Sequence, residues 1–184
     1  VKLGITPPGV EMVTMNTTSD WQALDSERQR YEAKRMAVYA GMVEAMDYHI
    51  GRLVMFLKSR GEFENTLFIF TSDNGAEGSG PADPGNFMTQ RQLGSLGYVS
   101  DYDTLGLKGS FNSISPSFAS AAVSPLAYYK FYSGEGGMRV PMIVAGASLP
   151  RHGVLSDAFS FVTDITPTIR SLVGVDPPQG RHGG

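Results

Sequence analysis

A long helical pattern that leads directly into an apolar strand is the feature of this sequence that most limits its fold. Over residues 26–60, apolar side chains recur with the period of an α-helix, and Gly61 follows as a stop signal. A short connection then leads into 65–71, where an apolar run indicates a buried strand. A helix joined in this way to an all-apolar strand is half of a βαβ unit, so we expect an α/β fold.

The rest of the chain predicts irregular segments and short elements. A helix over all of 26–60 would be about 50 Å long at 1.5 Å per residue, so a break near its start is an open alternative. Pro141 lacks an N–H and indicates a strand start or a sheet edge. Thr163 or Asp164 caps the last helix, with Pro167 in its first turn. In chain order we expect a surface loop over 1–25, a long loop over 76–116, a short helix over 117–123, strands over 139–145 and 158–162, and a helix ending at Leu172.

The composition excludes several classes of chemistry. Hydrophobic residues make up 41% of the 184 residues and the net charge is −3, so we expect a globular protein without a basic face for nucleic acid. The chain has no cysteine, so no disulfide, thiolate zinc site or cysteine nucleophile can form within it. No apolar run approaches the ~20 residues of a membrane span. Because the first residue is not Met and neither end carries a closing element, we expect a piece of a larger protein.

Two oxygen-bearing side chains follow the predicted strand 65–71. In the sequence Ser-Asp-Asn-Gly, Asp73 carries a carboxylate, Asn74 carries a carboxamide, and Gly75 allows a sharp turn where a Cβ would clash. Ligands bind at the carboxyl ends of strands in open α/β sheets, and calcium and magnesium prefer hard oxygen donors. Asp-Asn-Gly is also a common turn sequence, and the motif alone favours a turn over a metal site.

A second cluster precedes the strand expected at 139–145. Lys130 stands five residues before Glu135, which is followed by Gly136 and Gly137. The ammonium is a point charge suited to an anionic ester, and the two glycines allow close approach of the backbone. The alternative is a solvated surface lysine beside a loop, and this cluster alone does not decide between the two.

The order of these motifs resembles that of the sulfatase family. In this chain a helix, an apolar strand, Ser-Asp-Asn-Gly, a long loop, a lysine, Glu-Gly-Gly-x-Arg-Val-Pro-x-Ile and Asp-x-x-Pro-Thr follow one another between about residue 35 and residue 174. More narrowly, the chain is similar to bacterial formylglycine-dependent arylsulfatases of the alkaline-phosphatase-like superfamily. The resemblance implies a sheet sandwiched by helices, incomplete in this chain, with 1–184 as the central-to-late part of the large catalytic domain and 65–71 as its metal-site strand.

The resemblance also implies roles for individual residues. Asp73 and Asn74 match two ligands of an active-site Ca²⁺. Lys130 matches a lysine that contacts the sulfate and the leaving-group region. Lys108 is a rival for that role, but the spacing from Lys130 to Glu135 is the family's spacing. Other matched residues of the second cluster are implied to support it structurally: Glu135, Gly136 and Arg139.

Parts of the family pattern are absent from this sequence. The family's nucleophile is a formylglycine made from Cys or Ser in a C/S-x-P-S-R motif, and no such motif is present. The paired upstream aspartates and the upstream Lys-x-His are absent too, and none of the three histidines takes their place. The formylglycine is therefore expected in the parent enzyme and not in this chain.

The resemblance implies part of an arylsulfatase-like sulfuric ester hydrolase that acts on the sulfate ester of a small molecule at a Ca²⁺-dependent site. Two alternatives stay open: a phosphonate or phosphate ester hydrolase of the same superfamily, and a catalytically inactive fragment that lacks the nucleophile. The missing strands would leave apolar surface and open sheet edges through which the chain could associate. The sequence does not choose between the bacterial cytoplasm and the periplasm.

Overall fold

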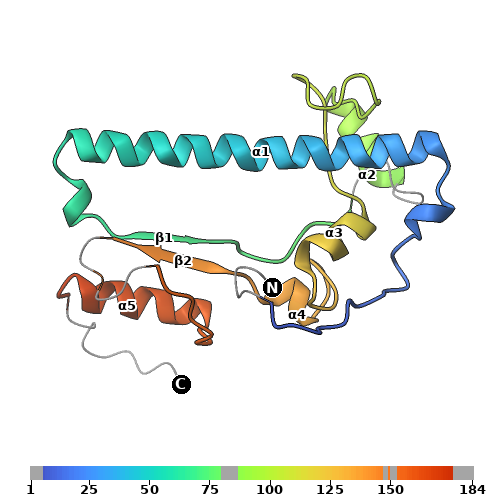
Figure 1. Ribbon diagram of the computed structural model, residues 1–184. Coiled ribbons are helices and arrows are strands. Elements are labelled where there is room, and N and C mark those ends of the chain that lie inside the picture. Colours follow the sequence, from blue (N-terminus) through green and yellow to red (C-terminus); the bar gives the residue numbers. More distant parts are fainter. Residues whose placement is uncertain (1–5, 80–86, 147–148, 150–152, 176–184) are drawn as a thin grey trace. The chain divides into compact units, whose positions relative to one another are not determined.

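The computed structural model describes residues 6–79, 87–146, 149 and 153–175 (Figure 1). Contacts divide the chain into two compact units, Val1–His152 and Gly153–Gly184. The first unit contains η1 (Trp21–Ala23), α1 (Ser26–Ser59), η2 (Phe63–Asn65), β1 (Phe68–Thr71), α2 (Phe87–Ser95), α3 (Pro116–Val123), α4 (Glu135–Met138) and β2 (Met142–Ala145). The second contains η3 (Val162–Asp164) and α5 (Ile165–Leu172). The described residues thus combine helices with a small sheet, in agreement with the predicted mixture of helices and strands.

Helix α1 is continuous, so the alternative of a break near its start is not realised (Figure 1). The Asp25 carboxylate accepts a 2.7 Å hydrogen bond from the Arg28 N–H and caps the first turn. Beyond the other end, Gly61 has a φ of +72°, a left-handed conformation that glycine adopts without steric cost. The observed helix therefore lies within one residue of the predicted range.

Helix α1 is anchored by a buried charged pair, while much of its apolar surface is exposed. Its buried residues are Glu32 and Arg35, whose Oε1 and Nη1 atoms lie 3.1 Å apart. Arg35 Nε donates a 2.5 Å hydrogen bond to the carbonyl of Ser113. Asn112 Nδ2 donates to the carbonyl of Arg35 at 3.0 Å. Further along α1, the following large apolar side chains are exposed: Met42, Val43, Met46, Ile50, Leu53, Met55 and Phe56.

The sheet consists of β1 and β2, paired antiparallel with Phe68 opposite Ala145 and Thr71 opposite Met142. An antiparallel pair is not the parallel pair that a βαβ unit contains, so the half-unit expected from the sequence is not completed within the described residues. The two strands bring together segments far apart in the sequence. The residues that follow β1 and those that precede β2 therefore lie at the same end of the sheet.

The strands differ from the predictions in length and burial. Both are four residues long, shorter than the predicted ranges 65–71 and 139–145, and β2 is exposed along its whole length. Pro141 comes immediately before β2, in agreement with the expected strand start. The third predicted strand, over 158–162, is wrong: these residues form no strand in the described part of the chain. An extended segment becomes a strand only when another strand satisfies its backbone groups.

The long loop predicted over 76–116 contains a helix that the sequence pattern did not reveal, α2. Helix α3 agrees with the prediction and begins at Pro116, where the missing N–H of proline costs nothing. The one-turn helix α4 was also missed, because its residues Glu135–Met138 include the two adjacent glycines that indicate a loop.

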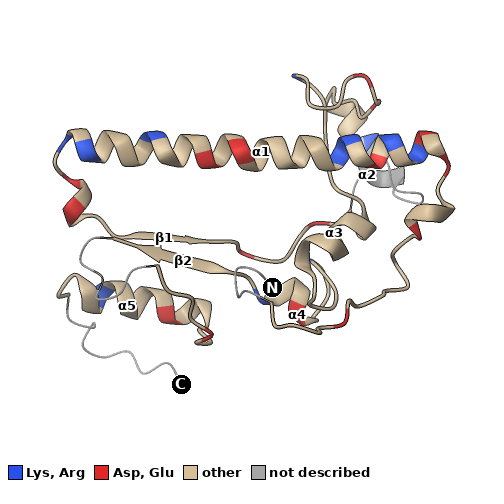
Figure 2. Cartoon of the chain, viewed as in Figure 1, with Lys and Arg blue, Asp and Glu red and all other residues tan. Residues whose placement is uncertain are grey.

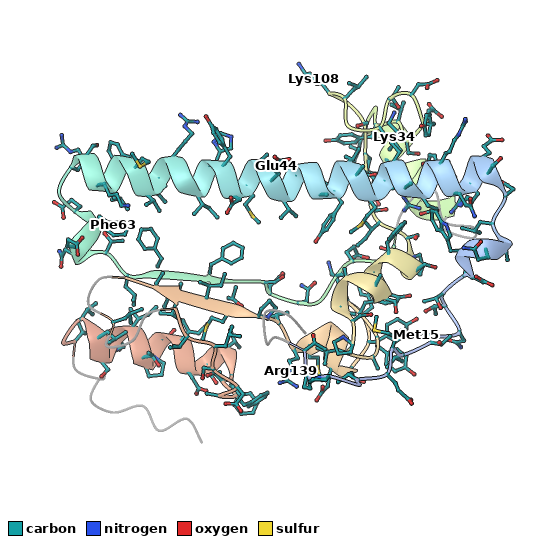
Figure 3. All side chains as sticks on the ribbon, in the orientation of Figure 1. Met15, Lys34, Glu44, Phe63, Lys108 and Arg139 are labelled. Carbon is teal, nitrogen blue, oxygen red and sulfur yellow. The ribbon has the colours of Figure 1, made fainter. Side chains whose placement is uncertain are left out.

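The buried core of the first unit lies beside α3. Met15, Ile114, Ala119 and Tyr129 form its centre, and Met15 reaches it from the N-terminal segment (Figure 3). Partly buried hydrophobic side chains pack around this centre: Met36, Tyr39, Ala76, Phe118 and Val123. Ala76 and Tyr129 are each one or two residues from a predicted site residue, so both site segments are attached to this core.

The second unit contains the helix predicted near the C-terminus. Helix α5 begins at Ile165 with Asp164 at its N-cap position, and Gly174 beyond its end has a φ of +69°. The Asp164 carboxylate accepts a 2.8 Å hydrogen bond from the Phe161 N–H, and Thr168 Oγ1 donates to the carbonyl of Asp164 at 2.6 Å. Of the two caps expected, Asp164 is the residue at the N-cap position of α5, but its carboxylate bonds to the residue before η3 and makes no capping hydrogen bond to α5.

Charged residues of both signs occur along α1, as Figure 2 shows, so this longest helix has no uniformly basic face. Within the described ranges, none of the helices has both the length and the apolar character needed to cross a membrane.

Candidate active site

The Ser-Asp-Asn-Gly segment begins directly after β1, at the end of the sheet where β2 begins. Thr71 Oγ1 donates a 3.1 Å hydrogen bond to the carbonyl of Pro141, which fixes the two segments together at this point. Asp73 is exposed and Asn74 is half-buried. Neither side chain makes a hydrogen bond to another described residue. Among these residues, nothing therefore competes with a ligand for the carboxylate oxygens of Asp73 or the amide oxygen of Asn74.

Backbone hydrogen bonds bring the two predicted clusters together. The Gly75 N–H donates to the carbonyl of Gly137 at 2.9 Å, and the Lys130 N–H donates to the carbonyl of Ala76 at 3.0 Å. The segment after Asn74 is therefore bonded to both ends of the second cluster. Because main-chain bonds hold it, this arrangement depends little on side-chain rotamers.

Close backbone packing requires glycine in both clusters, at Gly75 across the contact between the clusters and at Gly136 and Gly137 within the second cluster. A Cβ on Gly75 would lie 1.7 Å from the carbonyl oxygen of Gly136. A Cβ on Gly136 would lie 1.9 Å from the carbonyl oxygen of Tyr128, and one on Gly137 would lie 2.3 Å from that of Tyr132. The sequence-based expectation of close backbone approach is confirmed. At Gly75 the reason is this contact, since its φ is not among the positive values.

Lys130 lies on a strained turn beside a buried anchor. The residues Tyr128 and Phe131 have φ values of 68° and 79°, which cost about 1–3 kcal/mol each for residues other than glycine. Between them, the Tyr129 side chain is buried in the core. The folded structure therefore holds the backbone on both sides of Lys130, at Tyr128 and Phe131, in a conformation that a free loop would avoid.

The side chain of Lys130 forms an ion pair that the sequence analysis did not find. Its Nζ lies 2.9 Å from Glu77 Oε2, and both side chains are 36% exposed. The other carboxylate oxygen of Glu77 accepts hydrogen bonds from Ser79, at 2.9 Å from the N–H and 2.5 Å from Oγ. Glu77 was missed because its role depends on a partner far along the chain.

The pKa values follow from these contacts. The hydrogen bond from Lys130 to Glu77, followed by the charge of that carboxylate, raises the pKa of Lys130, and Asp73 adds to the effect. Burial would raise the pKa of Glu77, but hydrogen bonds from Ser79 and Lys130 outweigh it and lower the pKa. At neutral pH the site therefore contains the Lys130 ammonium beside the Glu77 carboxylate.

The other candidate residues lie outside this contact. Lys108 is exposed at the tip of a loop, and among the described residues it makes no ion pair with the cluster (Figure 3). Arg139, at the end of α4, forms an exposed 3.5 Å ion pair with Glu135, on the segment that carries Gly136 and Gly137. His49 is exposed on α1, 3.1 Å from Arg52, and has no contact with the described residues of the site.

The residues present supply only part of a metal site. Asp73 and Asn74 have the hard oxygen donors that calcium takes, but calcium normally needs six to eight oxygens. No group of three or more His, Cys, Asp or Glu side chains that could hold a metal is found among the described residues. The donor type therefore fits a hard divalent cation, while the number of donors does not complete its coordination.

Comparisons with known proteins identify the family of the chain. A model of the family described as Sulfatase matches residues 11–175, and the chain therefore belongs to the sulfatase family. It is 35% identical over 95% of its length to an arylsulfatase of Klebsiella aerogenes, covering 37% of that protein. It is 36% identical over 99% of its length to an uncharacterized sulfatase of Schizosaccharomyces pombe, covering 33% of it. The chain thus spans about a third of the length of these relatives.

A further relative is named for the wider superfamily. The chain is 27% identical, over 80% of its length, to a multifunctional alkaline phosphatase superfamily protein of Trinickia caryophylli, of which it covers 20%. The matched part of the chain is thus common to proteins named as sulfatases and to a protein of the wider superfamily. The family membership confirms the resemblance found in the sequence.

Proposed function

We propose that this chain is the part of a sulfatase catalytic domain that contributes one side of a sulfate-ester site. The observation that carries the proposal is the pair of backbone hydrogen bonds from Gly75 to Gly137 and from Lys130 to Ala76. They hold the segment with the Asp73 carboxylate and the Asn74 carboxamide beside the segment with the lysine. Oxygen donors together with a cation are suited to a tetrahedral ester anion.

The proposed roles follow from the chemistry of each group. Asp73 and Asn74 would be two ligands of a divalent cation, proposed to be Ca²⁺, and the remaining ligands would come from other parts of the full-length protein. Such a cation, when bound, neutralises charge on sulfate oxygens. The Lys130 ammonium would donate to the ester and stabilise the negative charge that develops on the leaving oxygen.

The nucleophile would also come from outside this segment. The sequence has no cysteine and no C/S-x-P-S-R motif, so a formylglycine can only be supplied by the rest of a full-length sulfatase. We likewise propose that strands β1 and β2 belong to a larger, helix-covered sheet of the alkaline-phosphatase-like type. The exposure of β2 along its whole length, and of the second half of β1, supports this, because apolar strands are ordinarily covered.

The test uses a full-length sulfatase that contains this segment. Asp73→Ala is expected to lower the turnover of an aryl sulfate by about 10²-fold or more, the scale of losing one preorganised charge-stabilising group, and to lower the calcium content of the purified protein. Asp47→Ala, which removes an exposed carboxylate from α1, is the matched control and should change neither. Unchanged turnover and calcium content in Asp73→Ala would remove Asp73 from the metal site.

A phosphate or phosphonate ester hydrolase is the second candidate, favoured by the relative from the alkaline phosphatase superfamily. Both kinds of ester carry tetrahedral anions that suit the same groups. A panel of aryl sulfates, phosphates and phosphonates with the same leaving group separates the candidates. The highest kcat/KM on a phosphorus ester would replace the sulfatase proposal with this one.

The inactive-fragment alternative concerns the 184-residue chain by itself. The shortage of metal donors among the described residues favours weak or absent calcium binding here. Calorimetric titration with calcium tests this directly. Tight stoichiometric binding together with sulfatase turnover by the isolated chain would refute the alternative.

A further inference from the structure

Glu77 is an acidic side chain that pairs with Lys130 of the candidate site and is held from both of its carboxylate oxygens. One carboxylate oxygen faces Lys130 Nζ at 2.9 Å, and the other accepts both hydrogen bonds from Ser79. Exposed ion pairs ordinarily contribute little to stability. The main effect of this pair is therefore expected to be on the position of the Lys130 ammonium and not on stability.

The backbones on both sides of the pair are locked together. The Lys130 N–H donates to the carbonyl of Ala76, immediately before Glu77. Immediately after it, Gly78 is buried so closely that a Cβ would lie 2.9 Å from Tyr129 Cε2 and 3.2 Å from Ala119 Cβ. The two ends of the ion pair thus begin from fixed positions, and only the side chains between them can move.

A lysine side chain ordinarily samples many rotamers, because its four-carbon stem is flexible. Its ammonium has three N–H donors. The contact with Glu77 uses one of them, and the other two donate to no described residue. An ammonium held in this way keeps two N–H donors for an anion. Because the side chain is already fixed, anion binding does not have to order it.

We propose that Glu77 is the positioning residue for Lys130, holding its ammonium so that the two remaining N–H groups face an anionic ester oxygen. This inference rests on the proposed function, because it assigns a purpose to Lys130 in that same site. Glu77 itself touches neither substrate nor reacting atoms in this scheme. It acts through Lys130.

Positioning and charge make opposite predictions for binding. If Glu77 only neutralised Lys130, removing its carboxylate would strengthen anion binding and lower KM. If it positions Lys130, removal lowers kcat, because the ammonium no longer meets the developing charge, while KM changes little. A Gln side chain keeps the length and an acceptor oxygen, so Glu77→Gln should rescue part of the loss seen in Glu77→Ala.

The first arm of the test measures kinetics in a full-length sulfatase that contains this segment. Glu77→Ala should lower kcat on an aryl sulfate by about 10- to 100-fold, the scale of a misplaced catalytic group, with Glu77→Gln between it and the unaltered protein. In a Lys130→Ala background, Glu77→Ala should have no further effect. The matched control is Glu44→Gln, an exposed glutamate on α1 (Figure 3), which should leave kcat unchanged. Additive effects, or a lower KM with an unchanged kcat, would overturn the proposal.

The second arm uses the 184-residue chain and does not depend on activity. With ¹⁵N-labelled lysine, the hydrogen-bonded Lys130 ammonium should give an NMR signal that exchanges slowly with water. This signal is identified by its loss in Lys130→Ala, because Lys34 Nζ also donates a hydrogen bond, to the carbonyl of Tyr102. Glu77→Ala should abolish this signal and Glu44→Gln should preserve it. A signal that survives Glu77→Ala overturns the positioning role. If the signal is lost as expected but Lys130→Ala leaves turnover intact, the proposed role of Lys130 in catalysis fails instead.

Discussion

At the scale of single residues, the candidate site depends on the absence of side chains. Gly75, Gly136 and Gly137 meet where two distant segments exchange a main-chain hydrogen bond, and each has a carbonyl oxygen where a Cβ would stand. Backbone atoms cannot move aside as a flexible side chain can. The position of Asp73 and Asn74 relative to Lys130 is therefore set by glycines that have no chemistry of their own.

Gly75→Ala is expected to destabilise the chain by about 3 kcal/mol or more, because overpacking against backbone cannot be relieved locally. Gly41→Ala is the matched control: Gly41 lies within α1, and a Cβ added there would meet nothing within 4 Å, so the alanine should stabilise the helix by roughly 0.5–1 kcal/mol. Urea unfolding followed by circular dichroism measures both. A Gly75→Ala variant as stable as Gly41→Ala would contradict the close contact.

At the scale of elements, α1 is attached to the rest of its unit by polar contacts. Arg35 is 1% exposed and donates hydrogen bonds to Ser113 while pairing with Glu32. Arg28 adds a second ion pair to the same glutamate, at 2.5 Å. A buried pair contributes little compared with apolar packing, but removing one partner leaves an uncompensated charge.

Arg35→Leu should lower the free energy of unfolding by about 1.5–3 kcal/mol, because it removes a charged donor from the Ser113 carbonyl and one of the two cations that pair with Glu32, while Arg28 remains. Arg52→Leu, at an exposed position of the same helix, should change it by only about 0.5 kcal/mol. Thermal and urea unfolding provide the comparison. Equal effects of the two substitutions would show that the buried pair does not anchor α1.

The elements that sequence reasoning could predict are those determined by nearby residues. Helices α1, α3 and α5 follow from apolar periodicity with Asp25, Pro116 and Asp164 at their starts. The strands were less predictable, because their length and partner depend on distant segments. The candidate site shows the same difference between local and distant determinants. Asp73, Asn74 and Lys130 stand in recognisable sequence motifs, whereas the contact between Glu77 and Lys130 arises only in the folded chain.

At the scale of the whole molecule, the chain exposes more apolar surface than a complete domain would. Large apolar side chains are exposed along α1 and on β2, among them Met46 at 44%, Leu53 at 50% and Ile143 at 60%. Exposed apolar patches and open strands promote association. The chain covers 37% and 33% of the two sulfatase relatives, and their additional segments are what we expect to cover these surfaces.

The isolated chain should therefore self-associate in a concentration-dependent way, which sedimentation velocity measures. Leu53→Glu should weaken this association, because it places a charge within the exposed apolar part of α1. Gln22→Glu makes the same change in net charge at an exposed position in η1 and should leave association unchanged. A monomer at all concentrations, in the presence of this exposed surface, would contradict the prediction.

The hydrogen bond between Gly75 and Gly137 also has a kinetic meaning. It closes a loop that includes the whole segment between β1 and α4, and closing so long a loop costs entropy before any contact repays it. The arrangement of the candidate site is therefore expected to form late in folding, together with the core. Hydrogen exchange of the Gly75 amide should require the same opening that exposes the core. The protection factor of this amide therefore reports whether the candidate site is assembled.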